Sequence, residues 1–167
     1  GYADCQFWPV PSSQTWLPFK VVVMQRSKEE GDNVLSHISG DYDYTCVALG
    51  KTFPDGSIEH GGVVNIEQGK GSYGNTIRMS GQRTWVTKGG AKQHLQPALP
   101  WRVHYGAILQ GNTLLFEFEL TDAEGKPLKG RTLCNIGMSE KRVKLEGTIY
   151  YNDKQGTTAQ IHMIKQG

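Results

Sequence analysis

A two-residue alternation of apolar and polar side chains begins at residue 41. In the first run, Tyr42, Tyr44 and Cys46 share one face, and polar residues stand between them; His60 later shares a face with Val64 in the same way. A period of two is typical of a half-buried β-strand rather than of a helix. The alternation predicts strands over residues 41–49, 57–67, 75–87, 101–110, 112–121, 128–138, 142–152 and 157–165.

Short turn-forming stretches, such as 54–56, 122–125 and 152–156, separate these predicted strands. Residues 88–100 carry glycines and prolines, and there we expect a longer loop. About eight sequential antiparallel strands predict an all-β fold, either a small up-and-down β-barrel or a sandwich. We favour the closed barrel, because closure removes the exposed strand edges.

The first part of the chain has a different character. Aromatic residues and prolines are interleaved over residues 1–19, and prolines at this density block both regular helices and central strands. We therefore expect an N-terminal arm or linker over 1–38, in which the polar second half offers a short helix, ahead of a barrel domain over 39–167.

Composition narrows the function classes. The chain has 167 residues, which suits one domain, and its net charge of +2 is too small for bulk binding of DNA or RNA polymers. The cysteines are three, and their spacing fits neither a disulfide framework nor a zinc motif. Cys46 and Cys134 lie on apolar strand faces, where we expect them to act as small hydrophobic residues.

The motifs of common catalytic sites are missing from the sequence. The histidines lack metal-ligand spacing, and neither a nucleophile elbow nor a phosphate-binding loop occurs. Glu117 and Glu119 share the polar face of one predicted strand, which indicates a solvated surface rather than an acid–base pair. We therefore expect no enzyme activity, no catalytic residue, no metal and no cofactor.

Arginine and tryptophan cluster on both sides of the predicted 88–100 loop. Arg83 and Trp85 precede it, and Trp101 and Arg102 follow it, so pairing of the two strands would gather them at one end of the sheet. Planar rings stack on bases, and guanidinium groups bind phosphates. In the alternative, the tryptophans plug the barrel and the arginines cover them. The candidate ligand-binding residues are Arg83, Trp85, Trp101, Arg102, Tyr42 and Tyr44, with Arg78 in reserve.

Glycine–aromatic motifs recur along these strands: G-x-Y-x-Y-x-C over 40–46, E-H-G-G over 59–62, I-x-M-x-G-x-R-x-W over 77–85, and a compatible G-x-I-x-Y step over 147–151. In these motifs the chain resembles the soluble domain of the two-transmembrane β-strand-rich effectors, which serve bacterial anti-phage defence signalled by cyclic oligonucleotides (CBASS and related systems).

This resemblance implies a β-barrel over 39–167 that acts as a receptor for a cyclic oligonucleotide such as a cyclic dinucleotide. It also implies transmembrane helices ahead of Gly1 that anchor the effector in the inner membrane, with this domain in the cytoplasm. Ligand binding would then drive self-association and membrane disruption. The proline-rich arm has no counterpart in the family pattern.

Two other functions stay open. A lipocalin-like or fatty-acid-binding-like barrel would carry a small apolar ligand in a wide apolar interior. A structural or protein-interaction barrel would have a filled interior and no concave mouth near Trp85 and Trp101.

Overall fold

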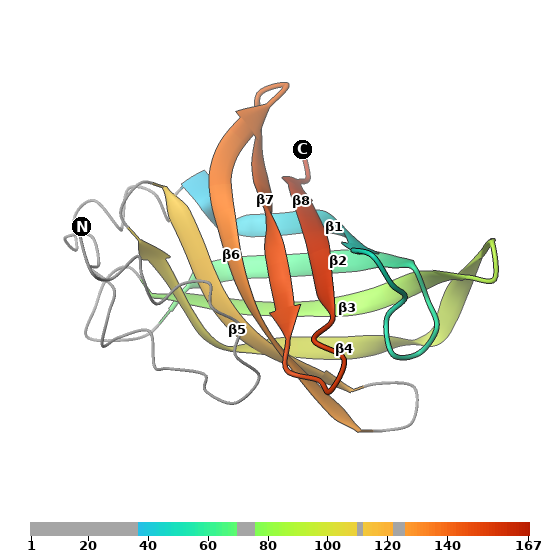
Figure 1. The fold of residues 1–167 in the computed structure, drawn as a ribbon. Helices are drawn as coiled ribbons and strands as arrows, with labels where there is room; N and C mark the ends of the chain where they lie inside the picture. Colours follow the sequence, from blue (N-terminus) through green and yellow to red (C-terminus); the bar gives the residue numbers. More distant parts are fainter. Residues whose placement is uncertain (1–36, 70–75, 110–111, 122–125) are drawn as a thin grey trace.

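The computed structural model describes residues 37–69, 76–109, 112–121 and 126–167. In these ranges, eight antiparallel strands form a closed barrel in which each strand pairs with its sequence neighbour and β1 pairs with β8 (Figure 1). The up-and-down barrel is therefore confirmed. The strands are β1 (Gly40–Ala48), β2 (Glu59–Gln68), β3 (Ile77–Lys88), β4 (Ala91–Leu109), β5 (Thr113–Thr121), β6 (Pro127–Ser139), β7 (Arg142–Tyr151) and β8 (Thr158–Lys165).

The predicted arm over 1–38, with its optional helix, lies outside the described residues except for its last two positions. Residues 39–167 form the barrel apart from the gaps named above. Its strand ends agree closely with the sequence prediction, with one exception.

The exception is the predicted loop over 88–100, which is wrong. Most of that segment is the first half of β4, and it continues a long hairpin with β3 that projects beyond the barrel (Figure 1). The connection is the turn at Gly89 and Gly90, whose φ angles are 61° and 79°. Positive φ at both turn positions suits glycine and matches the twist of a tight hairpin.

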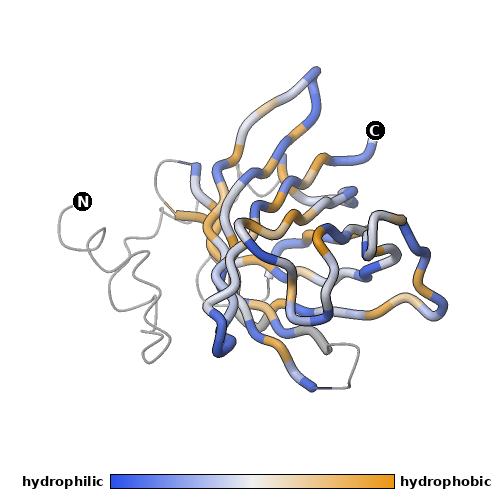
Figure 2. The backbone as a smooth tube through the Cα atoms, turned by 45° about the vertical axis from the view of Figure 1, so that its right-hand side comes forward, coloured by the Kyte–Doolittle hydropathy of each residue, from blue (hydrophilic) through white to orange (hydrophobic). Residues whose placement is uncertain are grey.

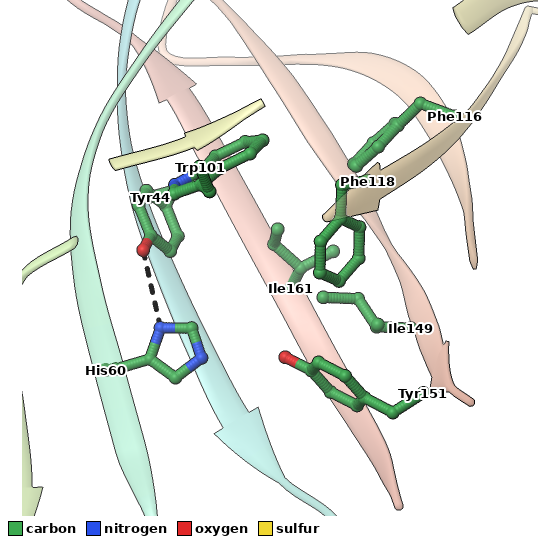
Figure 3. A pocket seen from close by; sticks show the side chains of 8 residues that line it. All are labelled: Tyr44, His60, Trp101, Phe116, Phe118, Ile149, Tyr151 and Ile161. Carbon is green, nitrogen blue, oxygen red and sulfur yellow. Dashed lines mark hydrogen bonds between the residues drawn. The ribbon is translucent and has the colours of Figure 1, made fainter. Parts of the chain in front are cut away.

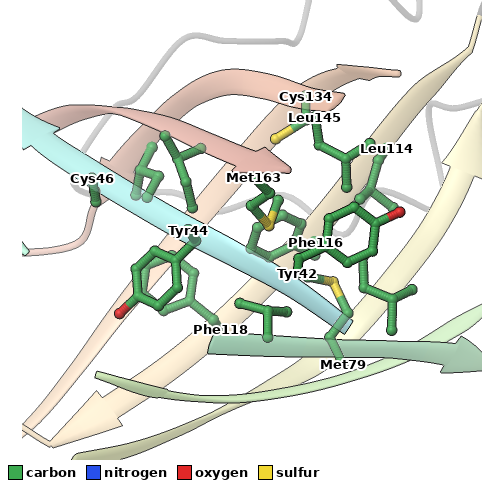
Figure 4. Packing of buried hydrophobic residues seen from close by; sticks show 14 of the residues in the cluster. Tyr42, Tyr44, Cys46, Met79, Leu114, Phe116, Phe118, Cys134, Leu145 and Met163 are labelled. Atoms are coloured by element: carbon green, nitrogen blue, oxygen red, sulfur yellow. The ribbon is translucent and has the colours of Figure 1, made fainter. Parts of the chain in front are cut away.

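The inward faces of the strands fill the barrel with apolar side chains (Figure 4). Cys46 and Cys134 are buried free thiols within this core, as predicted. Tyr42 is also fully buried, and its hydroxyl donates a 2.6 Å hydrogen bond to the carbonyl of Ile38. The strands alternate in hydropathy, and the tip of the β6–β7 hairpin is hydrophilic (Figure 2). The largest fully buried side chains are Tyr42, Phe116, Ile38, Ile66, Met79, Ile108, Leu114, Leu115, Leu145, Met163 and Val64.

Candidate functional site

Polar side chains enter the apolar interior at one end of the barrel. This end lies beneath the β1–β2 loop over residues 49–58 and beside the β7–β8 connection, because the backbone N–H of Leu49 donates to the carbonyl of Thr158. Inward-facing residues of neighbouring strands meet here, and Figure 3 shows most of them. The members of this interior cluster are Tyr44, His60, Arg83, Trp101, Phe118 and Tyr151.

Arg83 carries the charge of the interior cluster. It is only 6% exposed, and its Nη1 lies 3.5 Å from Oδ2 of Asp55. A direct charge-assisted hydrogen bond is shorter, at about 2.7–2.9 Å. Asp55 belongs to the β1–β2 loop, where its Oδ1 accepts hydrogen bonds from the backbone N–H and the hydroxyl of Ser57, at 2.9 and 2.6 Å. The counter-ion of a barrel arginine is therefore held by a loop, at a long distance.

His60 lies beside this charge and is itself buried. Burial, and secondarily the positive charge of Arg83, lowers the pKa of His60 well below its usual value, so the ring is neutral at pH 7. Its Nδ1 is 3.4 Å from the Tyr44 hydroxyl, and its Nε2 has no hydrogen-bond partner among the described residues. When Tyr44 donates to Nδ1, the proton of His60 is on Nε2 and faces the interior.

Trp101 adds a second donor of the same kind. Its Nε1 is buried and, within the described ranges, lacks a partner at hydrogen-bond geometry. The indole ring packs edge-on against Tyr44, with centroids 5.7 Å apart, and covers Gly81. A Cβ on Gly81 would lie 2.6 Å from the ring, so glycine is required for this tryptophan to fold inward.

Aromatic rings close the interior cluster from the loop side. Phe53 packs against His60 and Tyr151, with centroid distances of 4.8 and 5.8 Å. A cavity of about 20 Å³ remains among the side chains in Figure 3. A space of this size holds about one water molecule. Phe53 and the interior rings therefore fill this end of the barrel.

The structure places the seven predicted residues on two faces of the barrel wall. Tyr44, Arg83 and Trp101 meet in the interior cluster, whereas Tyr42 is inward but bonded to Ile38, away from Arg83. Arg78, Trp85 and Arg102 lie on the outer face. Arg78 is exposed and paired with Glu67, and Trp85 lies over Gly61 with the Lys92 ammonium 4.3 Å from its ring centroid.

A β-bulge explains why Arg83 and Trp85 separate. Arg83 is opposite Gly62 and Trp85 is opposite Gly61, so Thr84 is an extra residue in β3. Because adjacent residues of β2 face opposite sides of the sheet, their partners do so too. Regular alternation predicts one shared face for Arg83 and Trp85, two residues apart, and the bulge makes that prediction wrong.

Arg102 lines a groove on the outer face of β1 to β4. The groove has a volume of about 590 Å³, and Val63, Asn65, Gln82 and Pro100 contribute to it. Most of its other polar groups are exposed, and the half-buried Asn65 donates to Asp41 at 2.8 Å. The groove is a second surface on which binding can be tested.

Sequence reasoning missed several members of the site. His60 stood on an apolar strand face, which was a usable signal, since a buried polar side chain must find a partner. Tyr151 likewise lay in an alternating run. Asp55 and Phe53 belong to a loop, where no periodicity marks the residues that fold inward.

Neither a metal site nor a membrane-spanning helix is found among the described residues. No group of three His, Cys, Asp or Glu side chains there could hold a metal ion. In the same ranges, no helix has the length and apolar character needed to span a membrane.

The fold and the interior cluster define a small closed antiparallel β-barrel with a polar, aromatic end. No protein-family model matches the chain, and no curated protein matches its sequence. Among solved structures, the chain is similar to a redesigned β-barrel, with a TM-score of 0.50 and 14% identity over 87% of this chain and 99% of the other. At this identity the similarity shows the fold alone.

Proposed function

We propose that this barrel is the ligand-binding domain of a cyclic-oligonucleotide receptor, and that a phosphate of the ligand binds Arg83. The observation that carries the proposal is a guanidinium buried among aromatic rings, whose carboxylate partner sits 3.5 Å away on a loop. A cyclic dinucleotide offers two phosphates and two bases. Guanidinium groups bind phosphates, and rings such as Tyr44 and Trp101 stack on bases.

Binding at this end requires the β1–β2 loop to move. Ligand pockets typically measure about 300–1,000 Å³, whereas the cavity beside His60 measures about 20 Å³. Displacement of Phe53 would join this cavity to the solvent, because its ring separates His60 and Tyr151 from the loop side. Closure of a loop over a bound ligand is common in receptors and enzymes.

The wider setting of the proposal comes from the family resemblance. The barrel would face the cytoplasm on an effector anchored in the inner membrane, and ligand binding would shift the barrel towards self-associated forms that disrupt the membrane. The motifs over 40–46, 59–62 and 77–85 support this part.

Calorimetric titration with a panel of cyclic dinucleotides and trinucleotides tests the proposal. We expect at least one to bind, and Arg83→Ala to weaken its binding at least tenfold. The matched control is Arg142→Ala, since Arg142 is an exposed arginine at the start of β7. Light scattering on the same samples reports self-association. Failure of every ligand to bind, or equal binding by Arg83→Ala, contradicts the proposal, and a loss confined to Arg102→Ala moves the site to the outer groove.

The packed interior favours a second candidate, a protein-interaction barrel. Some apolar side chains are exposed, among them Met138 on β6 at 67% and Leu49 and Ile58 at the two ends of the β1–β2 loop. This candidate predicts that titration with the cyclic-oligonucleotide panel gives no heat of binding.

The apolar carrier is less well supported, because the interior described here has no room for a lipid chain. Native mass spectrometry for co-purified lipid tests it.

A further inference from the structure

We propose that the β1–β2 loop, residues 49–58, is a lid, and that the Asp55 carboxylate occupies the position that an oxyanion of the ligand takes beside Arg83. The inference deepens the proposed function and rests on it. It assigns the anionic group of the ligand to one place and makes binding there compete with closure of the lid.

The lid is a compact unit. The backbone N–H of Phe53 donates to the carbonyl of Ser57 at 2.7 Å, and the N–H of Gly56 donates to the carbonyl of Phe53 at 2.8 Å. Ser57 is fully buried and holds Asp55 through two further hydrogen bonds. These bonds lie within the loop, so the loop can swing away without breaking them.

Two side chains attach the lid to the barrel interior. Phe53 inserts its ring between His60 and Tyr151, and Asp55 reaches Arg83. At its base the lid is tied by backbone hydrogen bonds from Ala48 to Ile58, from Ile58 to Thr87 and from Leu49 to Thr158. If these bonds stay and the base acts as a hinge, opening costs one long ion pair and one set of ring contacts.

The N–H donors around Arg83 outnumber the acceptor atoms that Asp55 supplies. A guanidinium has five N–H donors in a planar fork, and a carboxylate or phosphate can engage two of them at once. Asp55 places one oxygen 3.5 Å from Nη1. Close by, Trp101 Nε1 and His60 Nε2 lack partners at hydrogen-bond geometry among the described residues, and the Tyr44 hydroxyl is the neutral acceptor beside Arg83 and Trp101. A phosphate has enough oxygens to accept from Arg83 and Trp101, and from His60 when its proton is on Nε2. Its charge excludes a second anion such as Asp55 from the same spot.

The neighbouring β7–β8 loop holds an aspartate by similar hydrogen bonds, over a longer span, and without an arginine. Asp153 accepts hydrogen bonds from the backbone N–H of Thr157 at 2.8 Å and from its hydroxyl. Asp153 has no salt bridge within the described part of the chain. The ion pair of Asp55 is therefore an addition to the local turn chemistry, which is what a stand-in for a ligand requires.

Asp55→Asn is the decisive variant, with Asp153→Asn as the matched control. Asparagine keeps an oxygen that accepts from Ser57 and removes the negative charge beside Arg83. We expect Asp55→Asn to bind the cyclic oligonucleotide of the panel about tenfold more tightly.

Lid opening is measured without ligand by the alkylation rate of Cys46, which is fully buried and pairs with His60 across β1 and β2. This rate should rise several-fold in Asp55→Asn and stay unchanged in Asp153→Asn. Mass spectrometry of peptides separates Cys46 from Cys5 and Cys134.

The two measurements separate the lid from the proposed function. If Cys46 reacts faster in Asp55→Asn but no cyclic oligonucleotide binds either protein, the proposed function fails and the lid stands. If the ligand binds the wild type, while Asp55→Asn shows neither tighter binding nor faster alkylation, the lid is overturned and the proposed function stands. Phe53→Leu replaces the ring between His60 and Tyr151 with a smaller side chain and leaves both charges in place. If the lid exists, this variant must also speed the alkylation of Cys46. It therefore provides the test if Asp55→Asn folds poorly.

Discussion

Arg83→Met tests whether the barrel keeps its interior arginine for stability or for binding. Across the 3.5 Å that separate Arg83 from Asp55, the Coulomb attraction is about 5 kcal/mol at an effective dielectric constant of about 20. Burying a guanidinium costs several kcal/mol, so the two terms nearly cancel. Methionine fills much of the same space and needs no counter-ion. Asp55 can rehydrate, because its side chain is 19% exposed and keeps its hydrogen bonds from Ser57.

We therefore expect Arg83→Met to change the free energy of unfolding by no more than about 1 kcal/mol. Asp55→Asn leaves the buried charge unpaired and should lower that free energy by about 1–2 kcal/mol, less than a fully enclosed pair would lose because the lid can open. Urea unfolding followed by circular dichroism measures both variants, and Arg142→Met controls for loss of a surface arginine. A loss above about 3 kcal/mol in Arg83→Met would refute the reasoning and make Arg83 a structural residue.

Three further predictions concern titration and packing. The pKa of His60 is lowered in the folded protein, so between about pH 6.5 and that lowered pKa only the unfolded chain binds a proton at this histidine. The melting temperature should therefore fall as pH drops below about 6.5, and it should fall less in His60→Gln. Burial raises the pKa of the Cys46 thiol to about 12, and that of Cys134 as well, so unfolding releases these protons above about pH 9 and the melting temperature should fall there; Cys46→Ala should reduce this loss. A Cβ on Gly147 would lie 1.9 Å from a backbone oxygen of β6, so Gly147→Ala should lower the free energy of unfolding by about 2 kcal/mol or more. A Cβ on Gly137 would have its nearest contact at 4.0 Å, so Gly137→Ala should change that free energy by less than about 0.5 kcal/mol.

The strands could be predicted wherever one face of the sheet is buried and the other is wet. That condition holds around the barrel, so alternation located the strands closely. It fails in the first half of β4, where residues 91–97 project beyond the barrel and nearly all are exposed. A strand with two wet faces has no apolar period, and only the Gly89–Gly90 pair marked the hairpin there.

The site was harder to predict, for two physical reasons. A β-bulge inverts the face of every later residue in its strand, and the single extra residue Thr84 moved Trp85 outside while Arg83 stayed inside. Loop residues obey no period at all, so Asp55 could be assigned to a turn but not to the interior. Aromatic and arginine clusters along the sequence were therefore an incomplete guide to which side chains meet.

A better criterion was already present in the alternation. Apolar neighbours on the same face place His60 and Arg83 inside the barrel, and a polar group there must be paired or serve a ligand. The structure supplies each with less than a full set of partners. Arg83 has a long ion pair and the neutral Tyr44 hydroxyl beside it, and His60 has an Nε2 that is unpartnered within the described residues. An incompletely paired polar group in a packed interior is retained at a cost in stability. That cost is explained if Arg83 is kept for an anion that competes with Asp55, and it is unexplained if the barrel is only a filled scaffold.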